Sequence, residues 1–175
     1  MFKTKQLVIN AMLAAMCAAL GALALDMTSI KVTFESLPIL LGALLFGPVA
    51  GAAIGGVGTL IYQLLRYGVS ATTVLWILPY VLSGWLCGYA AKKSGFALNR
   101  SQVLLLVVVC ELIVTLINTG VMYLDARIYG YYFPGFITGS LAIRLVICVV
   151  KAVVFGAILP ILLQAVKKIA GAPAE

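Results

Sequence analysis

The segment VLLLVVVCELIVTLINTGVMYL, from Val103 to Leu124, decides the fold of this chain. It is apolar over nearly its whole length and contains one charged residue, Glu111. A helix of this length, rising 1.5 Å per residue, crosses the ~30 Å hydrocarbon core of a bilayer. A strand of a transmembrane barrel would instead alternate apolar and polar residues over ~10 positions. The segment therefore predicts a membrane-spanning helix.

The composition extends this interpretation to the whole chain. The 175 residues are 64% hydrophobic and 10% charged, with a mean hydropathy of +1.18. Soluble domains carry about 25% charged residues. We therefore predict an all-α, multi-pass membrane protein whose residues 1–175 form one integral-membrane domain. The expected spans are 6–25, 37–47, 48–65, 71–91, 103–124 and 139–166.

Two of these spans have unusual lengths. The apolar run Leu7–Leu25 is longer than the core of a typical signal peptide, so we expect it to remain as the first helix. The second span, 37–47, covers only ~17 Å as an ideal helix and must be incomplete, tilted or extended by its neighbours. A polar loop, 26–36, separates these two spans.

The distribution of basic residues predicts the orientation in the membrane. With six spans both termini lie on one side, where seven of the 12 lysines and arginines fall, against three in the opposite loops. The positive-inside rule then predicts cytoplasmic termini. The basic residues follow span ends and do not form a patch interleaved with solvent-facing aromatics, so nucleic acid is not an expected partner. The two groups are Lys3, Lys5, Lys92, Lys93, Arg100, Lys167 and Lys168 on one side, and Lys31, Arg66 and Arg127 on the other.

Two cations remain inside a predicted span. The segment SLAIRLVICVVK, residues 140–151, places Arg144 and Lys151 seven positions apart, nearly two helical turns, so both share one face. A charge at the bilayer centre costs about 2.5–3.5 kcal/mol on insertion scales, so such residues face the bundle interior and are usually paired. Glu111 and Asn118 have the same spacing in the preceding span.

Counting depth from the outer ends of the helices places Lys151 level with Glu111, and Arg144 level with Asn118. One interpretation is a structural ion pair between Glu111 and Lys151. The other is a ligand site in which Arg144 and Lys151 accept an anion, Asn118 lies beside them, and Glu111 bonds to a polar ring. A pairing of Glu111 with Lys151 leaves Arg144 without an embedded carboxylate, which an external anion could replace. Three loop carboxylates are alternative partners for Arg144: Asp26, Glu35 and Asp125.

Aromatic side chains gather toward the predicted outer half. An interfacial belt explains such residues by default, and a lid or stacking surface for a planar ligand is the functional alternative. The aromatic candidates for ligand contact are Tyr62, Trp76, Tyr80, Tyr123 and Phe133.

Small residues recur at helical spacing in the first and third spans. Gly47, Gly51 and Gly55 form a GxxxGxxxG pattern, which allows helix backbones to approach closely in lipid. The alanines of the first span have two possible roles, packing inside the bundle and docking of a partner subunit. They are Ala11, Ala14, Ala15, Ala18, Ala19 and Ala22.

The residues needed for catalysis are missing from the sequence. It contains no histidine, no paired carboxylates at a workable spacing, and no GxxxxGK[ST] phosphate loop. The four cysteines are scattered singly through apolar segments. We therefore expect no enzymatic activity, no metal site and no cofactor.

The block IKVTFESLPILLGALLFGPVAGAAIGGVGTLIYQLL, Ile30–Leu65, resembles the substrate-binding (S) components of energy-coupling factor (ECF) transporters. YFPGF (132–136) and RLVICVVK (144–151) are similar to the folate-type members. One departure is Thr59, where such members often have an aspartate. The resemblance implies a bacterial plasma-membrane protein that captures folate, or a reduced folate, from outside. It also implies docking through the alanines of the first helix on a transmembrane scaffold subunit driven by two ABC ATPases.

Alternatives remain open at the level of the sequence. Within the class, the vitamin could be pantothenate, riboflavin, thiamine or a queuosine precursor. Outside it, the chain could be an autonomous small secondary transporter or a structural membrane-assembly protein.

Overall fold

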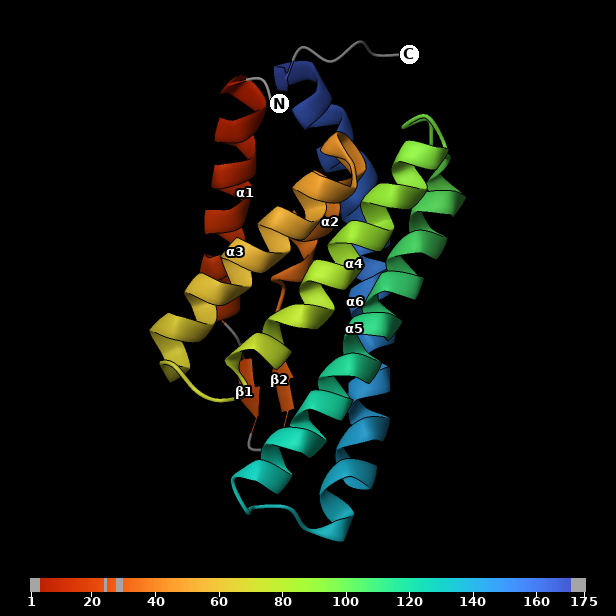
Figure 1. Ribbon diagram of the computed structural model, residues 1–175. Coiled ribbons are helices and arrows are strands. Elements are labelled where there is room, and N and C mark those ends of the chain that lie inside the picture. Colours follow the sequence, from red (N-terminus) through yellow and green to blue (C-terminus); the bar gives the residue numbers. More distant parts are fainter. Residues whose placement is uncertain (1–3, 24, 28–29, 171–175) are drawn as a thin grey trace.

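The computed structural model describes residues 4–23, 25–27 and 30–170 (Figure 1). These residues form six helices and one antiparallel pair of short strands. The elements are α1 (Thr4–Ala22), β1 (Leu25–Met27), β2 (Ile30–Val32), α2 (Ser36–Phe46), α3 (Pro48–Tyr67), α4 (Thr73–Lys93), α5 (Arg100–Ile128) and α6 (Pro134–Ala170).

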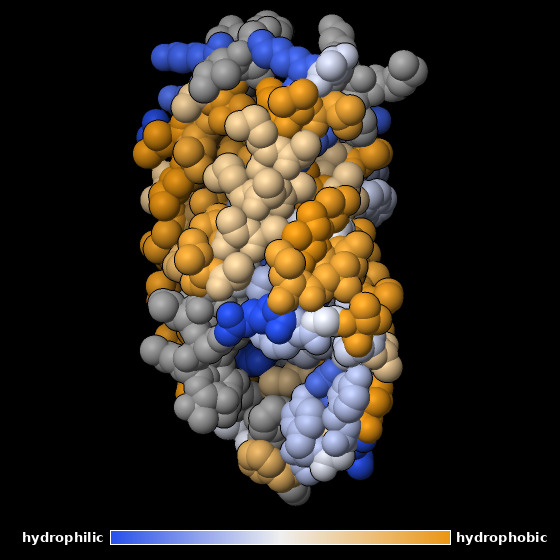
Figure 2. Space-filling view, turned by 90° about the vertical axis from the view of Figure 1, so that its left-hand side faces the viewer, coloured by the Kyte–Doolittle hydropathy of each residue, from blue (hydrophilic) through white to orange (hydrophobic). Residues whose placement is uncertain are grey.

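Five helices are long and apolar enough to cross a membrane, and α2 is the shorter apolar helix that the sequence predicts. Figure 2 shows a broad band of apolar side chains with hydrophilic residues above and below it. Large side chains such as Val149, Val153 and Ile161 on α6 are more than half exposed. Lipid contact explains this exposure, because a bilayer core is as apolar as these side chains.

A single glycine separates α2 from α3. Gly47 has a φ of +89°, which L side chains rarely adopt, and its N–H donates to the carbonyl of Ala43. Pro48 follows at the first position of α3, where its missing N–H costs nothing. The FGP motif therefore ends one helix and starts the next without a loop.

The other two glycines of the GxxxGxxxG pattern bring α3 against α4. A Cβ atom on Gly51 would overlap the carbonyl oxygen of Gly84, and one on Gly55 would lie 2.6 Å from the carbonyl oxygen of Tyr80. Internal packing is thus confirmed for Gly51 and Gly55. Gly47 serves the turn instead.

The alanines of α1 divide between two faces. Ala14 and Ala18 are buried, and Ala14 lies against Gly58 of α3, where a Cβ atom would lie 2.9 Å from the Ala14 carbonyl oxygen. These two alanines belong to the bundle interior. The remaining four are exposed and recur along one side of the helix: Ala11, Ala15, Ala19 and Ala22.

Some predicted boundaries were wrong. The first helix ends at Ala22, and the hairpin of β1 and β2 begins at Leu25, inside the predicted first span, and continues into the predicted polar loop. In this hairpin Asp26 faces Lys31 in register. Strands of three residues are too short to produce an alternating pattern. The fifth helix begins at Arg100, because the Gln102 side chain accepts a hydrogen bond from the N–H of Asn99 at 2.9 Å.

The last two helices also run further than their apolar segments, to Ile128 in α5 and from Pro134 to Ala170 in α6. Both helices are therefore longer than the apolar segment that is needed to cross the hydrocarbon core of a bilayer. The start of α1 and the end of α6 lie at the same end of the bundle (Figure 1), as six spans require.

We expect Gly51→Ala to lower the melting temperature in detergent, because the new methyl group meets the backbone of α4, which cannot move aside as a side chain can. Overpacking of this kind costs about 1–3 kcal/mol. The matched control is Gly120→Ala, on a helix where nothing lies within 4 Å of the new Cβ atom. Equal melting temperatures for the two variants would contradict the close α3–α4 contact.

Candidate ligand-binding site

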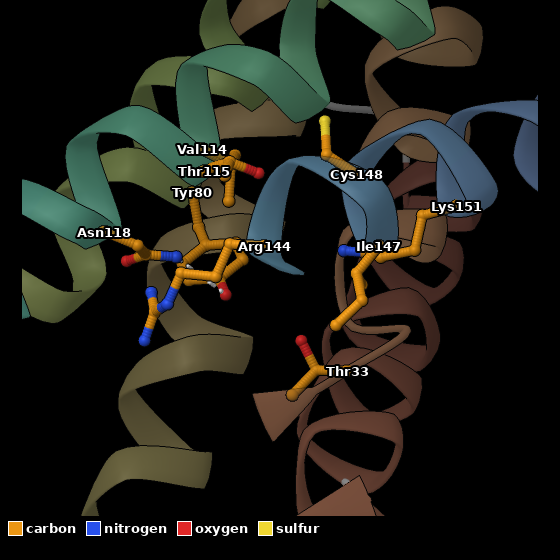
Figure 3. Close-up of a pocket in the computed structure, with 9 residues that line it drawn as sticks. All are labelled: Thr33, Tyr80, Val114, Thr115, Asn118, Arg144, Ile147, Cys148 and Lys151. Atoms are coloured by element: carbon orange, nitrogen blue, oxygen red, sulfur yellow. Dashed lines mark hydrogen bonds between the residues drawn. The ribbon is translucent and has the colours of Figure 1, made fainter. Parts of the chain in front are cut away.

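A polar pocket lies among α4, α5, α6 and the residue that follows β2. Its lining is toward the end of the bundle where α6 begins, since it uses the first half of α6 and the first half of α4. Figure 3 shows Arg144 and Asn118 gathered with Tyr80 on one side, and Lys151 and Ile147 on the other. The lining residues are Thr33, Tyr80, Val114, Thr115, Asn118, Arg144, Ile147, Cys148 and Lys151.

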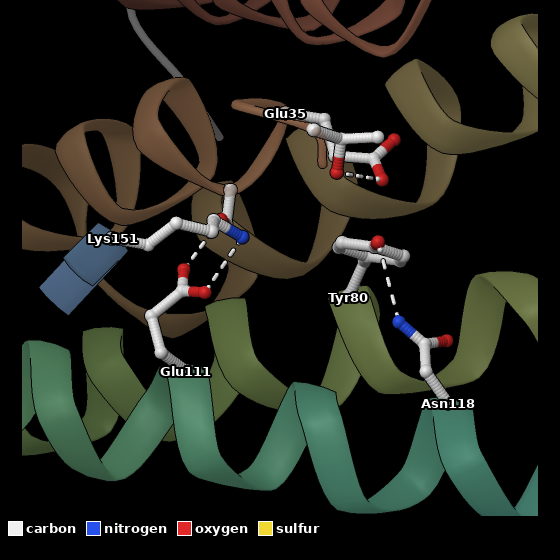
Figure 4. A network of polar contacts seen from close by, with 7 residues as sticks. Glu35, Tyr80, Glu111, Asn118 and Lys151 are labelled. Carbon is white, nitrogen blue, oxygen red and sulfur yellow. Dashed lines mark hydrogen bonds and ion pairs between the residues drawn. The ribbon is translucent and has the colours of Figure 1, made fainter. Parts of the chain in front are cut away.

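An ion pair forms one boundary of this pocket. Lys151 Nζ of α6 lies 2.7 Å from Glu111 Oε2 of α5, and the side chains are 11% and 1% exposed. Ser36, at the start of α2, donates to Glu111 Oε1 and accepts from Lys151 Nζ at 3.3 Å (Figure 4). The ion pair, which was one of two interpretations of the sequence, is present in the structure, at the equal depth that helical geometry predicts. The contact joins three helices and uses the charge of Lys151.

Arg144 is the second cation of the pocket and has no such partner. It is half-buried, and its Nη2 donates to Met122 Sδ at 2.9 Å. Thioether sulfur is a weak acceptor. The Nε atom is buried, and no acceptor within the described part of the chain reaches it. The pocket therefore contains a guanidinium that donates to one weak acceptor and has a buried Nε without a partner among the described residues.

The loop carboxylates do not take this role among the described residues. Asp125 accepts hydrogen bonds from Thr72 and Tyr131, which ties the end of α5 to the start of α4. Partial burial, together with the Asp125 carboxylate, raises the pKa of Tyr131 to about 12. Glu35 accepts from Thr33 Oγ1 at 2.9 Å. The side chain of Asp26 lies outside the described residues.

Tyr80 connects the two sides of the polar cluster. Its hydroxyl accepts from Asn118 Nδ2 at 3.3 Å, and it stands between Asn118 and Glu35 (Figure 4). Tyr80 is 6% exposed and Glu35 2% exposed. Asn118 Oδ1 is buried with no hydrogen-bond partner among the described residues. Among the described residues, the pocket thus has a buried acceptor without a partner, Asn118 Oδ1, and a buried donor without a partner, Arg144 Nε.

Of the predicted site residues, four line the pocket: Tyr80, Asn118, Arg144 and Lys151. Glu111 lies behind Lys151 as its partner. The side chains of Thr33, Thr115 and Cys148 were not predicted. Small hydroxyl and thiol groups occur throughout membrane helices, and only the fold brings these three to one cavity.

The other aromatic candidates lie outside this lining. Tyr62 is 2% exposed and packs edge-on against Tyr67 with ring centroids 6.1 Å apart, so it belongs to the core. Trp76 is half-buried in the first turn of α4. Tyr123 and Phe133 are exposed at the loop end of α5 and α6, 37% and 56% respectively. A direct ligand contact is not supported for these four in this conformation.

The outer aromatic cluster has its own contacts. Tyr123 and Tyr132 meet edge-to-face at 5.3 Å, and the Arg127 guanidinium lies over both rings at 5.5 and 5.0 Å. Arg127 Nε also donates to the Tyr123 hydroxyl at 3.2 Å. This arrangement suits an interfacial aromatic belt, which is the default interpretation of aromatic side chains at the end of a membrane bundle.

The fold and the pocket define a class: a small, multi-pass α-helical membrane protein with a polar pocket inside its bundle. Comparison with known proteins gives the family. The family model described as "ECF-type riboflavin transporter, S component" matches residues 1–168. The chain therefore belongs to the S components of ECF-type transporters, integral proteins of the bacterial plasma membrane that bind a vitamin and associate with the energy-coupling module.

Solved structures support the fold. The S component of a bacterial ECF transporter aligns with a TM-score of 0.67 and 20% identity, over 93% of this chain and 98% of that one. The S component for biotin from an ECF-type ABC transporter aligns with a TM-score of 0.63 and 17% identity, over 94% and 95%. No curated protein matches.

We expect Lys151→Met to destabilise the protein strongly, because Glu111 would remain buried without its counter-charge. Breaking a buried pair by removing one partner costs about 3–5 kcal/mol. The double variant Glu111→Gln/Lys151→Met should recover most of the loss, and Lys168→Met, at an exposed position, should change little. Thermal unfolding in detergent measures all three. A double variant no more stable than Lys151→Met would contradict a pairwise interaction.

Proposed function

We propose that this S component captures folate, or a reduced folate, from the outside and delivers it through an ATPase-driven energy-coupling module. The observation that carries the proposal is Arg144, a guanidinium in the pocket with a buried Nε that lacks a partner among the described residues. A carboxylate is the natural complement, because charge-assisted bonds to arginine are strong and fit its planar fork.

The remaining lining residues suit the other parts of such a ligand. Folate combines a pterin, an aminobenzoate and a glutamate with two carboxylates. Tyr80 supplies an aromatic ring, while Thr33 and Asn118 supply polar groups for ring edges or amides. Lys151 is neutralised by Glu111, so Arg144 is the cation that remains for the tail.

The direction of capture follows from the charge count. With the termini in the cytoplasm, as the positive-inside rule predicts, the end where α6 begins faces outward. The pocket lies toward that end, so its ligand would enter from outside.

Docking on the scaffold subunit is proposed for the exposed alanine face of α1. The four exposed alanines present a flat stripe that another helix can approach closely, as small residues do in membranes. Ala14 and Ala18 are buried within the chain and do not contribute. ATP hydrolysis is assigned to the partner ATPases, since this sequence contains no phosphate-binding loop.

Riboflavin is the second candidate, because the matching family model carries that name. Riboflavin has no carboxylate and would leave the charge of Arg144 without a counter-ion. The two candidates therefore differ in their dependence on this residue.

We expect Arg144→Gln to weaken folate binding by at least tenfold, since a lost charge-assisted hydrogen bond is worth about 1.5–3 kcal/mol. Equilibrium binding of folate and of riboflavin to the purified protein measures this. Arg127→Gln serves as the control, because Arg127 is a cation at the same end of the bundle but outside the pocket. Tight binding of riboflavin, unchanged by Arg144→Gln, would replace folate by riboflavin as the substrate.

We expect Ala15→Leu to reduce co-purification with the scaffold subunit and ATPases while leaving vitamin binding unchanged, because the larger side chain separates the two helices. Gly120→Leu, at an exposed position on α5, is the control and should leave assembly intact. Normal assembly of the Ala15 variant would exclude this face of α1 as the docking surface.

A further inference from the structure

The pocket contains two unsatisfied polar groups of opposite kind. Arg144 Nε is a buried donor and Asn118 Oδ1 a buried acceptor, and neither has a hydrogen-bond partner among the described residues. Both side chains line the same cavity. In the structure, Asn118 Nδ2 donates to the Tyr80 hydroxyl, and Oδ1 is the amide atom left without a partner among the described residues.

The Arg144 guanidinium of α6 reaches α5 close to Asn118. Arg144 Nη2 contacts Met122, which lies one helical turn beyond Asn118, so the guanidinium is within about 6 Å of the asparagine along the helix axis. Figure 3 shows both side chains reaching toward the same side of the pocket. Any ligand group that meets one of them is therefore near the other.

The surrounding charges leave Arg144 as the anion receptor. Lys151 is paired with Glu111, and Glu35 is hydrogen-bonded to Thr33 on the far side of Tyr80. The sulfur contact of Arg144 is weak, so an incoming carboxylate would replace it at little cost.

A ligand that satisfies both groups must offer an N–H donor and an anion joined by a short link. An N-acyl amino acid has this pattern, because its amide N–H and its carboxylate are separated by one or two carbon atoms. A carboxylate without a nearby N–H would leave Asn118 Oδ1 buried and unpaired. A neutral imide would leave Arg144 without a counter-ion.

We propose that the pocket recognises the N-acyl amino acid part of its vitamin, with the carboxylate on Arg144 and the amide N–H on Asn118 Oδ1. This inference rests on the proposed function as a vitamin-binding S component. It defines a ligand class that includes folate, an N-aroyl glutamate, and pantothenate, an N-acyl β-alanine. It excludes flavins.

The test is calorimetric binding to the intact protein in detergent with matched pairs of probes. Pteroate keeps a benzoate carboxylate but lacks the glutamate and the amide N–H of folate, and pantothenol has an alcohol in place of the carboxylate of pantothenate. We expect at least one complete probe, folate or pantothenate, to bind, and to bind at least tenfold more tightly than its truncated partner. Riboflavin should not bind.

Two variants assign the contacts. Asn118→Leu should weaken binding of the complete probe about tenfold and reduce its advantage over the truncated one. Gln164→Leu, which also replaces an amide side chain by leucine but at an exposed position of α6 outside the pocket lining, should leave affinity within about twofold. If Asn118→Leu fails to fold, the probe pairs on the native protein still decide the question.

Truncated probes that bind as tightly as complete ones, or riboflavin binding that ignores Arg144→Gln, would overturn this inference and leave a vitamin-binding S component in place. Failure of every vitamin probe to bind would overturn the proposed function itself, and the inference with it.

Discussion

The ion pair between Glu111 and Lys151 is the constraint on which the arrangement of the bundle depends. Neither charge is tolerated alone in an apolar interior, so α5 and α6 must face each other where these residues are level. Ser36 joins the pair and fixes the start of α2 against both helices. The helical part of this crossing, α2, is too short to span the bilayer alone and is held in place by such lateral contacts, together with its apolar packing.

The pair also determines what the neighbouring pocket can bind. Glu111 neutralises the positive charge of Lys151. Arg144, two turns away on the same helix, has a contact with the sulfur of Met122 and an Nε without a partner among the described residues. The chain segment from Thr33 to Ser36 runs between the two features. Thr33 lines the pocket, and Ser36 is hydrogen-bonded to the ion pair. One short segment therefore connects the pocket lining to the buried charges.

The sequence predicts those parts of the structure that depend on hydrophobicity and helical geometry. Six helices follow from apolar runs. The equal depth of Lys151 and Glu111 in the membrane follows from the fixed rise per residue of a helix. The contact of Gly51 with α4 follows from the spacing of small residues. These features are determined locally, so a single chain is sufficient to infer them.

Other features depend on which side of a helix faces the interior, and the residue type does not specify that. Tyr62 and Tyr80 are both tyrosines within apolar spans. Tyr62 packs in the core against Tyr67, whereas Tyr80 lines the pocket. Thr33 reaches the pocket because the hairpin places it there. Ala14 and Ala15 are adjacent in sequence, yet Ala14 is buried and Ala15 is exposed.

The central claim is that Arg144 receives an anionic vitamin in a pocket closed on one side by the Glu111–Lys151 pair. Mass spectrometry of the small molecule that co-purifies with the protein from cells grown in rich medium tests this most directly. We expect a carboxylate-bearing vitamin of the folate kind, retained by the native protein and absent from the Arg144→Gln variant. Recovery of a neutral flavin from both proteins would contradict it.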